Sequence, residues 1–242
     1  MKVNRVNWHA LAVDDVLNIL KTRLQGLDED EVKERLALYG PNELRREKNR
    51  PKLVIFLNQF KNVLILILLI ATGLSIIIGE VLDAVLIVTI VIVSAVLGTF
   101  QEYRAERALE ALRKLTAPEA TVIRSGVEKR VLAREIVPGD ILVLMAGDRV
   151  PADARVFESH ELKLDESSLT GESTTVTKIV DPLPEDTPLA DRSDMVYAGT
   201  VVVYGKGKAI VVATGMNTEM GKIAEIVQEV KEEKTPLEKR ID

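Results

Sequence analysis

The chain has 242 residues, of which 47% are hydrophobic and 29% charged, and a formal net charge of −5. It has no basic patch with interleaved aromatic residues, so nucleic acid is not an expected partner. It has no cysteine, which excludes disulfides and thiolate metal sites. Residues 1–8 contain no apolar run, so a secretory signal peptide is not expected at the start.

Residues 1–50 are predicted to form a cytosolic helical region. A first amphipathic helix, with its leucines at helical spacing, is expected to end at Gly26. Asp28 is followed three residues later by Glu31, the spacing of a capping box, which predicts the start of a second helix. Gly40 and the proline after it should stop that helix.

Residues 51–102 are predicted to form a transmembrane helical hairpin. Two stretches, Asn62–Gly79 and Ala84–Gln101, hold 18 residues each and no charged side chain. At about 1.5 Å per residue a helix of that length spans ~27 Å, close to the ~30 Å hydrocarbon core of a bilayer. The alternative, a pair of core helices in a soluble domain, is disfavoured because a chain of this size cannot bury two such stretches.

Charge predicts the orientation of this hairpin. The link between the two stretches contains Glu80 and Asp83 but no Lys or Arg, whereas basic residues flank the hairpin on both outer sides. Since positive residues stay cytoplasmic, both termini are expected in the cytosol of an integral protein of the cell membrane. Lys61 lies near the end of the first stretch, where its ammonium group can snorkel to the interface.

The rest of the chain divides into a stalk, a β-rich domain and a final helix. Residues 103–118 continue the second span as a polar helix that Pro118 ends. Residues 119–216 change to a period of two, with turns expected at Ser125-Gly126 and at Gly205-Lys206-Gly207. Residues 217–242 are predicted to form a cytosolic amphipathic helix capped by Asn217 or Thr218. The sequence ends without a stop signal, so a longer parent, with a third span next, is expected.

The stretch 162–178 carries the candidate catalytic residues. The alternating run Leu162-Lys163-Leu164 predicts a strand, and Thr170-Gly171-Glu172-Ser173 follows it after a polar segment. Gly171 can adopt backbone angles closed to other residues, so a sharp turn there would push Glu172 outward. A carboxylate framed by hydroxyl groups can hold and polarise a water molecule. Taken alone, such a tetrapeptide is more often a solvated loop.

Several motifs in this order resemble the P-type ATPases, pumps that form an aspartyl phosphate. The actuator signature of that family is similar to residues 165–173, and further family motifs match residues 137–141, 147–153 and 214–223. Residues 39–44 and 101–106 resemble the N-terminal region and second span of the type II, calcium-pump-like members. Some calcium pumps carry acidic residues where this chain has Lys61-Asn62, which leaves the cation open.

The resemblance implies an α+β membrane protein: a two-helix transmembrane hairpin plus a mostly β cytosolic actuator domain, distorted jelly-roll-like, with flanking helices. It implies catalytic roles for Thr170, Gly171, Glu172 and Ser173, with Glu172 activating the water that hydrolyses the aspartyl phosphate. No cofactor or metal site is expected in this chain. ATP and Mg²⁺ belong to the intact pump.

Phosphorylation and nucleotide-binding domains of the same pump are the expected protein partners, and the lipid bilayer surrounds the hairpin. The phosphorylation motif Asp-Lys-Thr-Gly-Thr does not occur in this sequence, so the chain alone is not expected to turn over ATP. The likeness favours Ca²⁺ as the cation. Two alternatives remain: the same architecture pumping Na⁺, K⁺ or H⁺, or a membrane-anchored β-domain that only binds a partner.

Overall fold

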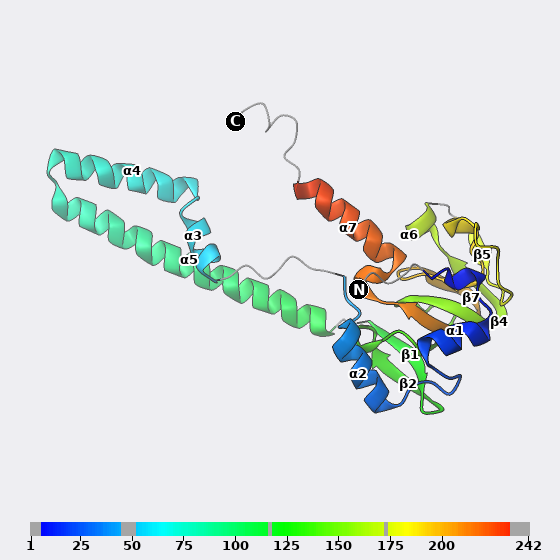
Figure 1. Ribbon diagram of the computed structural model, residues 1–242. Coiled ribbons are helices and arrows are strands. Elements are labelled where there is room, and N and C mark those ends of the chain that lie inside the picture. Colours follow the sequence, from blue (N-terminus) through cyan, green and yellow to red (C-terminus); the bar gives the residue numbers. More distant parts are fainter. Residues whose placement is uncertain (1–5, 45–51, 116–117, 172–173, 233–242) are drawn as a thin grey trace. The chain divides into compact units, whose positions relative to one another are not determined.

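The computed structural model describes residues 6–44, 52–115, 118–171 and 174–232 (Figure 1). Contacts within the chain divide it into two compact units. Residues 1–45 and 118–242 form the first, here called the β unit, and residues 46–117 form the second, the hairpin unit. The N-terminal helices and the β strands, predicted as separate segments, thus belong to one unit.

The described part of the hairpin unit is helical. Its elements are α3 (Lys52–Gln59), α4 (Val63–Ile78) and α5 (Val81–Leu115). The side chain of Asn62 accepts a hydrogen bond from the backbone N–H of Leu64 and so starts α4. Gly79, in the left-handed conformation, ends α4, and α5 then runs alongside it (Figure 1). The predicted pair of adjacent apolar helices is therefore present.

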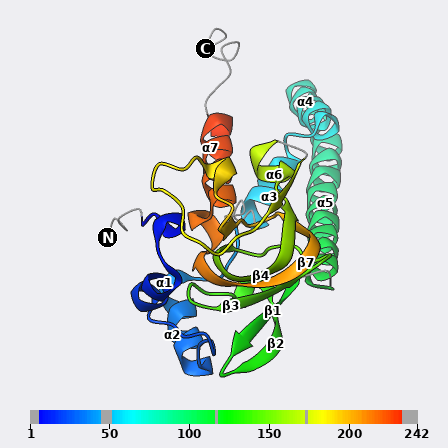
Figure 2. The same cartoon turned by 90° about the vertical axis from the view of Figure 1, so that its right-hand side faces the viewer.

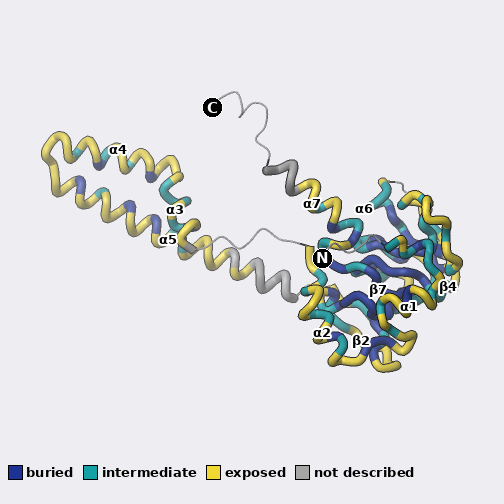
Figure 3. The backbone as a smooth tube through the Cα atoms, in the orientation of Figure 1, coloured by how far each residue is buried: buried dark blue, intermediate teal, exposed yellow. Residues whose placement is uncertain are grey.

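One described helix, α5, is by itself long and apolar enough to cross a membrane, over Val81–Ala105. A second candidate consists of Leu53–Gln59 and α4 together, with a 67° bend between them. Only 17% of the apolar window of α5 is buried, whereas a core helix of a soluble protein would be mostly covered. Figure 3 colours much of this part of α5 as exposed. α5 continues without a break to Leu115, which confirms the predicted continuous helix.

The β unit is built on an antiparallel sheet (Figure 2). The strand order is β2-β1-β3-β7-β4-β5, with β6 also paired to β4. Its described strands are β1 (Glu119–Arg124), β2 (Val127–Leu132), β3 (Ile141–Met145), β4 (Asp153–Asp165), β5 (Thr175–Thr177), β6 (Met195–Val196) and β7 (Val201–Ala213). Its described helices are η1 (Trp8–Ala10), α1 (Val13–Leu20), α2 (Glu29–Tyr39), η2 (Ala133–Glu135), α6 (Ser167–Thr170), η3 (Leu189–Asp191), η4 (Gly215–Asn217) and α7 (Glu219–Glu232). The predicted mixed α+β fold is confirmed.

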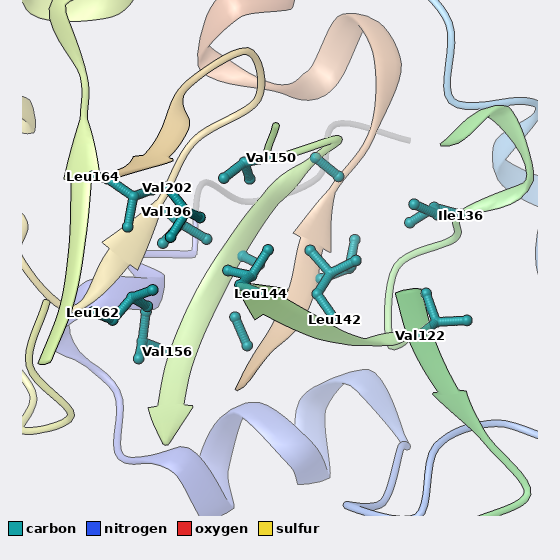
Figure 4. Close-up of a cluster of buried hydrophobic side chains, with 14 residues drawn as sticks. Val122, Ile136, Leu142, Leu144, Val150, Val156, Leu162, Leu164, Val196 and Val202 are labelled. Carbon is teal, nitrogen blue, oxygen red and sulfur yellow. The ribbon is translucent and has the colours of Figure 1, made fainter. Parts of the chain in front are cut away.

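Two hydrophobic clusters use alternate residues of the same strands. Leu142 of β3 belongs to a cluster of fourteen buried side chains that includes Val156 of β4 (Figure 4). Its neighbour Ile141 belongs to a second cluster, which contains Ile210 of β7 and Val16 of α1. Successive side chains of a strand point to opposite faces, so both faces of the central strands are buried, one of them under the N-terminal helices.

The predicted hairpin turn at Gly205-Lys206-Gly207 is wrong, because β7 runs unbroken through these residues. The strand predicted at Leu162-Lys163-Leu164 is likewise part of a longer one, because β4 runs for 13 residues. The two long strands pair with several register shifts. A Cβ atom at Gly205 would lie 2.3 Å from the carbonyl oxygen of Glu161, and one at Gly207 would lie 2.5 Å from that of Glu158. These glycines allow close approach of two bent strands and do not mark a turn.

The first helix ends earlier than predicted. α1 stops at Leu20, followed by Lys21 in the left-handed conformation, and does not extend to Gly26. Arg35 of α2 donates hydrogen bonds to the carbonyl oxygens of Leu20 and Lys21, which satisfies acceptors left open at the helix end. The capping box of Asp28 and Glu31 at the start of α2 is confirmed.

Candidate functional site

The candidate catalytic residues lie in the connection between β4 and β5. The last pair of the β4–β5 ladder is Asp165 with Thr175, so residues 166–171 lie outside the ladder. The first half of the segment forms α6, a single helical turn (Figures 1 and 2). The sequence prediction of a strand followed by a tight polar turn is confirmed here.

Local hydrogen bonds start and hold this turn. A carboxylate oxygen of Asp165 accepts the backbone N–H of Ser167 at 2.9 Å. The hydroxyl and N–H groups of Ser167 lower the pKa of Asp165 below its ordinary value. The hydroxyl of Thr170 donates to the carbonyl oxygen of Glu166 at 3.1 Å, and Leu169 packs against the second hydrophobic cluster. The turn is therefore attached to the β unit by its own backbone and by one apolar side chain.

Gly171 ends the turn in the left-handed conformation, with a φ of 78°. Its N–H donates to the carbonyl oxygen of Ser167 at 2.9 Å. A Cβ atom built at Gly171 would meet no other atom within 4 Å, so the backbone conformation, and not crowding, calls for glycine. Glu172 and Ser173 lie outside the described residues, and the roles predicted for all four residues stay predictions.

A buried ion pair at the base of this segment was not foreseen. The carboxylate of Glu166 lies 2.6 Å from the ammonium group of Lys178, and the two side chains are 2% and 0% exposed. Burial raises the pKa of Glu166 and lowers that of Lys178, and the opposite charge of the partner offsets part of each shift. One signal for it existed in the sequence: Glu166 continues the alternation of the buried Leu162 and Leu164.

A second buried ion pair lies in the same part of the β unit. The guanidinium of Arg155 lies 2.9 Å from a carboxylate oxygen of Asp194, and neither side chain is exposed. Arg155 also donates to the carbonyl oxygens of Leu11 and Val180, so it ties the N-terminal segment to the loop after β5. Burial raises the pKa of Asp194 to about 6. Among the described residues, no group of three or more His, Asp or Glu side chains could hold a metal ion.

Comparison with known proteins identifies the fold. The family model of the P-type ATPase actuator domain matches residues 114–228, and that of the cation transporter/ATPase N-terminus matches residues 8–75. The calcium-transporting ATPase of Bacillus subtilis is 44% identical over 98% of this chain and 27% of its own length. The human calcium-transporting ATPase type 2C member 1 is 42% identical over 96% of this chain and 26% of its own length. The chain belongs to the P-type ATPases.

The two family models coincide with the structure of this P-type ATPase chain. The N-terminal match begins at Trp8 in η1 and extends into α4, and the actuator match runs from the end of α5 into α7. The loop with α6 therefore lies in the actuator domain. The resemblance to calcium-pump-like members is confirmed by relatives that are calcium-transporting ATPases. The chain spans about a quarter of the length of these curated relatives.

Proposed function

We propose that this P-type ATPase chain supplies the actuator and first membrane hairpin of an ATP-driven cation pump. The observation that carries the proposal is the helical turn after β4, which the exposed Gly171 ends in the left-handed conformation, within an actuator domain. The names of the relatives favour Ca²⁺ as the transported ion. ATP and Mg²⁺ would bind phosphorylation and nucleotide-binding domains outside this chain.

In this proposal Glu172 serves the hydrolysis of the aspartyl phosphate. Its carboxylate accepts a proton from a water molecule as the water oxygen attacks phosphorus, the bond to the aspartate oxygen breaks, and phosphate is released. Covalent catalysis divides ATP hydrolysis into two steps, and the second needs such a base. Thr170 and Ser173 would support Glu172 by hydrogen bonds, and Gly171 would let the phosphate approach the backbone.

The proposal also assigns a mechanical role to α5. At about 1.5 Å per residue, its 35 residues make a helix of ~52 Å without a break. Such a helix can pass a movement of the actuator domain to the hairpin and thereby gate ions. The hairpin would lie in the lipid bilayer of the cell membrane, with both termini in the cytosol, because basic residues flank it on both outer sides.

A chimeric pump tests the function. This chain replaces the matching 239-residue stretch of the Bacillus subtilis calcium-transporting ATPase, and phosphoenzyme formation from labelled ATP and its decay after a chase are measured. Glu172→Gln should form phosphoenzyme normally but slow its decay by about 10²–10⁴-fold, the usual contribution of a positioned base. ATP-driven calcium uptake into vesicles tests the cation.

Glu128→Gln is the matched control, because Glu128 is an exposed carboxylate of the same domain in β2, where it pairs with Ile123 of β1. It should leave the decay rate unchanged. Normal decay in Glu172→Gln would remove the catalytic assignment, and a chimera that forms no phosphoenzyme would contradict the role as a pump actuator. ATP-driven uptake of Na⁺, K⁺ or H⁺ without uptake of Ca²⁺ would overturn the proposed ion.

A further inference from the structure

The candidate loop returns to the sheet through a very short strand. β5 has three residues, and its sheet partner in the described part of the chain is β4 alone. β4, by contrast, is held on its other side by β7, through pairs such as Leu164 with Val202. A short ladder at the edge of a sheet is marginal by itself, so the returning half of the loop needs another attachment.

Lys178 provides that attachment directly after β5. Its backbone N–H donates to the carbonyl oxygen of Leu162 at 2.8 Å, and its own carbonyl oxygen accepts the hydroxyl of Ser159 at 2.8 Å. Its ammonium group reaches 2.6 Å from Glu166, the residue that follows the last paired position of β4. The ion pair therefore joins the two chain segments on either side of the loop, residue 166 before it and residue 178 after it.

The ion pair between Glu166 and Lys178 lies on the face of the β4–β5 strand pair that is turned toward the core. Leu162, Leu164 and Glu166 alternate with partly exposed residues and are themselves buried, so their side chains share the inner face. The backbone of Glu166 also holds the helical turn α6, because its carbonyl oxygen accepts the N–H groups of Leu169 and Thr170. The carboxylate that contacts Lys178 thus belongs to the same residue from which α6 begins.

Stability alone does not account for two buried charges at this place. Taking both charges out of water costs about as much as their attraction returns, and apolar replacements of similar volume are often neutral or stabilising. An ion pair differs from an apolar contact in fixing direction and distance, which matters where a neighbouring group must be placed accurately. The segment joined by this pair contains the proposed catalytic carboxylate.

We propose that Glu166 and Lys178 are positioning residues that fix the loop carrying Glu172 for hydrolysis of the aspartyl phosphate. The inference rests on the proposed function, but the bracing of the loop can be measured without it. The test variant is Glu166→Leu/Lys178→Met, which replaces the ion pair by apolar side chains of similar size. The control is Glu29→Gln/Lys129→Gln, which removes an exposed ion pair between α2 and β2.

The first measurement is amide hydrogen exchange of this chain in detergent micelles. The test variant should exchange about tenfold faster, or more, in peptides covering residues 167–177, with β3 and β7 unchanged, because only the loop loses an attachment. The control should match the wild type throughout. Unchanged exchange in the loop would overturn the proposal.

The second measurement is phosphoenzyme decay in the chimeric pump. The test variant should form phosphoenzyme normally and slow its decay about 10- to 100-fold, as expected when a catalytic group is displaced slightly. Normal decay in the test variant, together with slow decay in Glu172→Gln, would overturn the positioning role. Normal decay in Glu172→Gln itself would instead refute the proposed function. The hydrogen-exchange result alone would then show whether the ion pair braces the loop.

Glu166→Gln keeps the proposal testable where the double variant does not fold. Glutamine keeps the length of the side chain and an oxygen acceptor for Lys178 but removes the negative charge. Its loop exchange should fall between that of the wild type and a tenfold increase, and its phosphoenzyme decay should slow to a matching degree. Decay that stays at the wild-type rate while the loop exchanges faster would overturn the positioning role.

Discussion

Two glycines of the β unit have nearly the same φ angle but different surroundings. Gly26 has a φ of 78° and Gly126 a φ of 77°, both in the left-handed region. A Cβ atom at Gly26 would lie 1.8 Å from the carbonyl oxygen of Ile123 in β1, whereas at Gly126 no atom lies within 4 Å. Glycine is therefore required at position 26 for two reasons. Its φ lies in the left-handed region, and a side chain there would collide with the backbone of β1, on which the N-terminal region packs.

Gly26→Ala should lower the free energy of unfolding by about 2–5 kcal/mol. An L-residue in the left-handed region costs about 1–2 kcal/mol, and overpacking against backbone adds roughly 1–3 kcal/mol. Gly126→Ala should cost only the first of these amounts. Urea unfolding of the chain in micelles, followed by the fluorescence of Trp8, its single tryptophan, measures both. Equal costs for the two variants would contradict the predicted contact.

The pH dependence of stability should report on Asp153. Its two carboxylate oxygens accept the backbone N–H groups of Ala198 and Glu219 and so tie β4 to the start of α7. Burial raises its pKa from 3.8 to about 6. A carboxyl whose pKa is raised by folding contributes stability that is complete below the ordinary pKa and is lost as pH rises through the folded value.

The wild type should therefore lose stability relative to Asp153→Asn as pH rises from about 4 to about 7. The change amounts to about 3 kcal/mol at most, at about 1.4 kcal/mol per pKa unit. Asparagine has one hydrogen-bond acceptor fewer at every pH, so it shifts the stability difference between the two proteins by a constant amount. The slope of that difference against pH then reports the titration of Asp153. Urea unfolding at several pH values measures it, with the exposed Asp186→Asn as baseline. A flat difference would show that the carboxyl titrates alike in both states.

At this scale the sequence predicted conformation better than burial. The left-handed turn at Gly171 and the capping box at Asp28 depend on the residue and its near neighbours, and both are present. The burial of Glu166 and Lys178 depends on which strands pair and which face they cover. A charged residue in a polar segment gives little indication of that, so the ion pair was missed.

The element scale shows where local patterns mislead. β4 and β7 are 13 residues long and pair with each other through several register shifts. Glycine, lysine and glycine in succession are typical of a hairpin turn, and the sequence does not show that another strand lies against Gly205 and Gly207. The long helices were predicted correctly because their signal, uninterrupted apolar composition, lies within the helix itself.

The hairpin unit should depend on a small residue between its helices. Ala95 of α5 is 0% exposed, whereas the next residue, Val96, is 56% exposed. Ala95→Leu should destabilise the unit by about 1–3 kcal/mol, because the larger side chain separates α5 from the helices packed on it. Unfolding by sodium dodecyl sulfate, followed by helical circular dichroism, measures the change.

Val96→Leu is the matched control, since it enlarges a side chain that already faces away from the other helices. It should change the unfolding midpoint little, because a larger apolar group on this face remains in contact with detergent or lipid. A similar loss of stability in both variants would mean that α5 does not use the Ala95 face for packing.

At the scale of the whole molecule, the N-terminal region and the sheet should unfold together. Val16 of α1 is fully buried with Ile141 of β3 and Ile210 of β7, and Trp8 packs on the same cluster. Val16→Ala should lower the free energy of unfolding by about 2 kcal/mol. Trp8 fluorescence and the circular dichroism of the sheet should move to the same lower urea concentration.

Leu38→Ala serves as the control for this prediction, because Leu38 of α2 is 74% exposed. It should leave the transition within about 0.5 kcal/mol of the wild type. If Val16→Ala shifted the Trp8 signal and left the sheet transition in place, the N-terminal helices would be a separate cooperative unit.

The β unit is assembled from two pieces of chain with the hairpin unit inserted between them. During synthesis the N-terminal helices leave the ribosome before the hairpin unit. Arg155, which donates to the carbonyl oxygen of Leu11, follows 144 residues after Leu11, and Ile210, which packs with Val16, follows later still. The apolar helices α4 and α5 emerge in the interval. Membrane targeting would therefore precede closure of the β unit, and a nascent chain halted before β7 would hold its first helices without the strand that covers them.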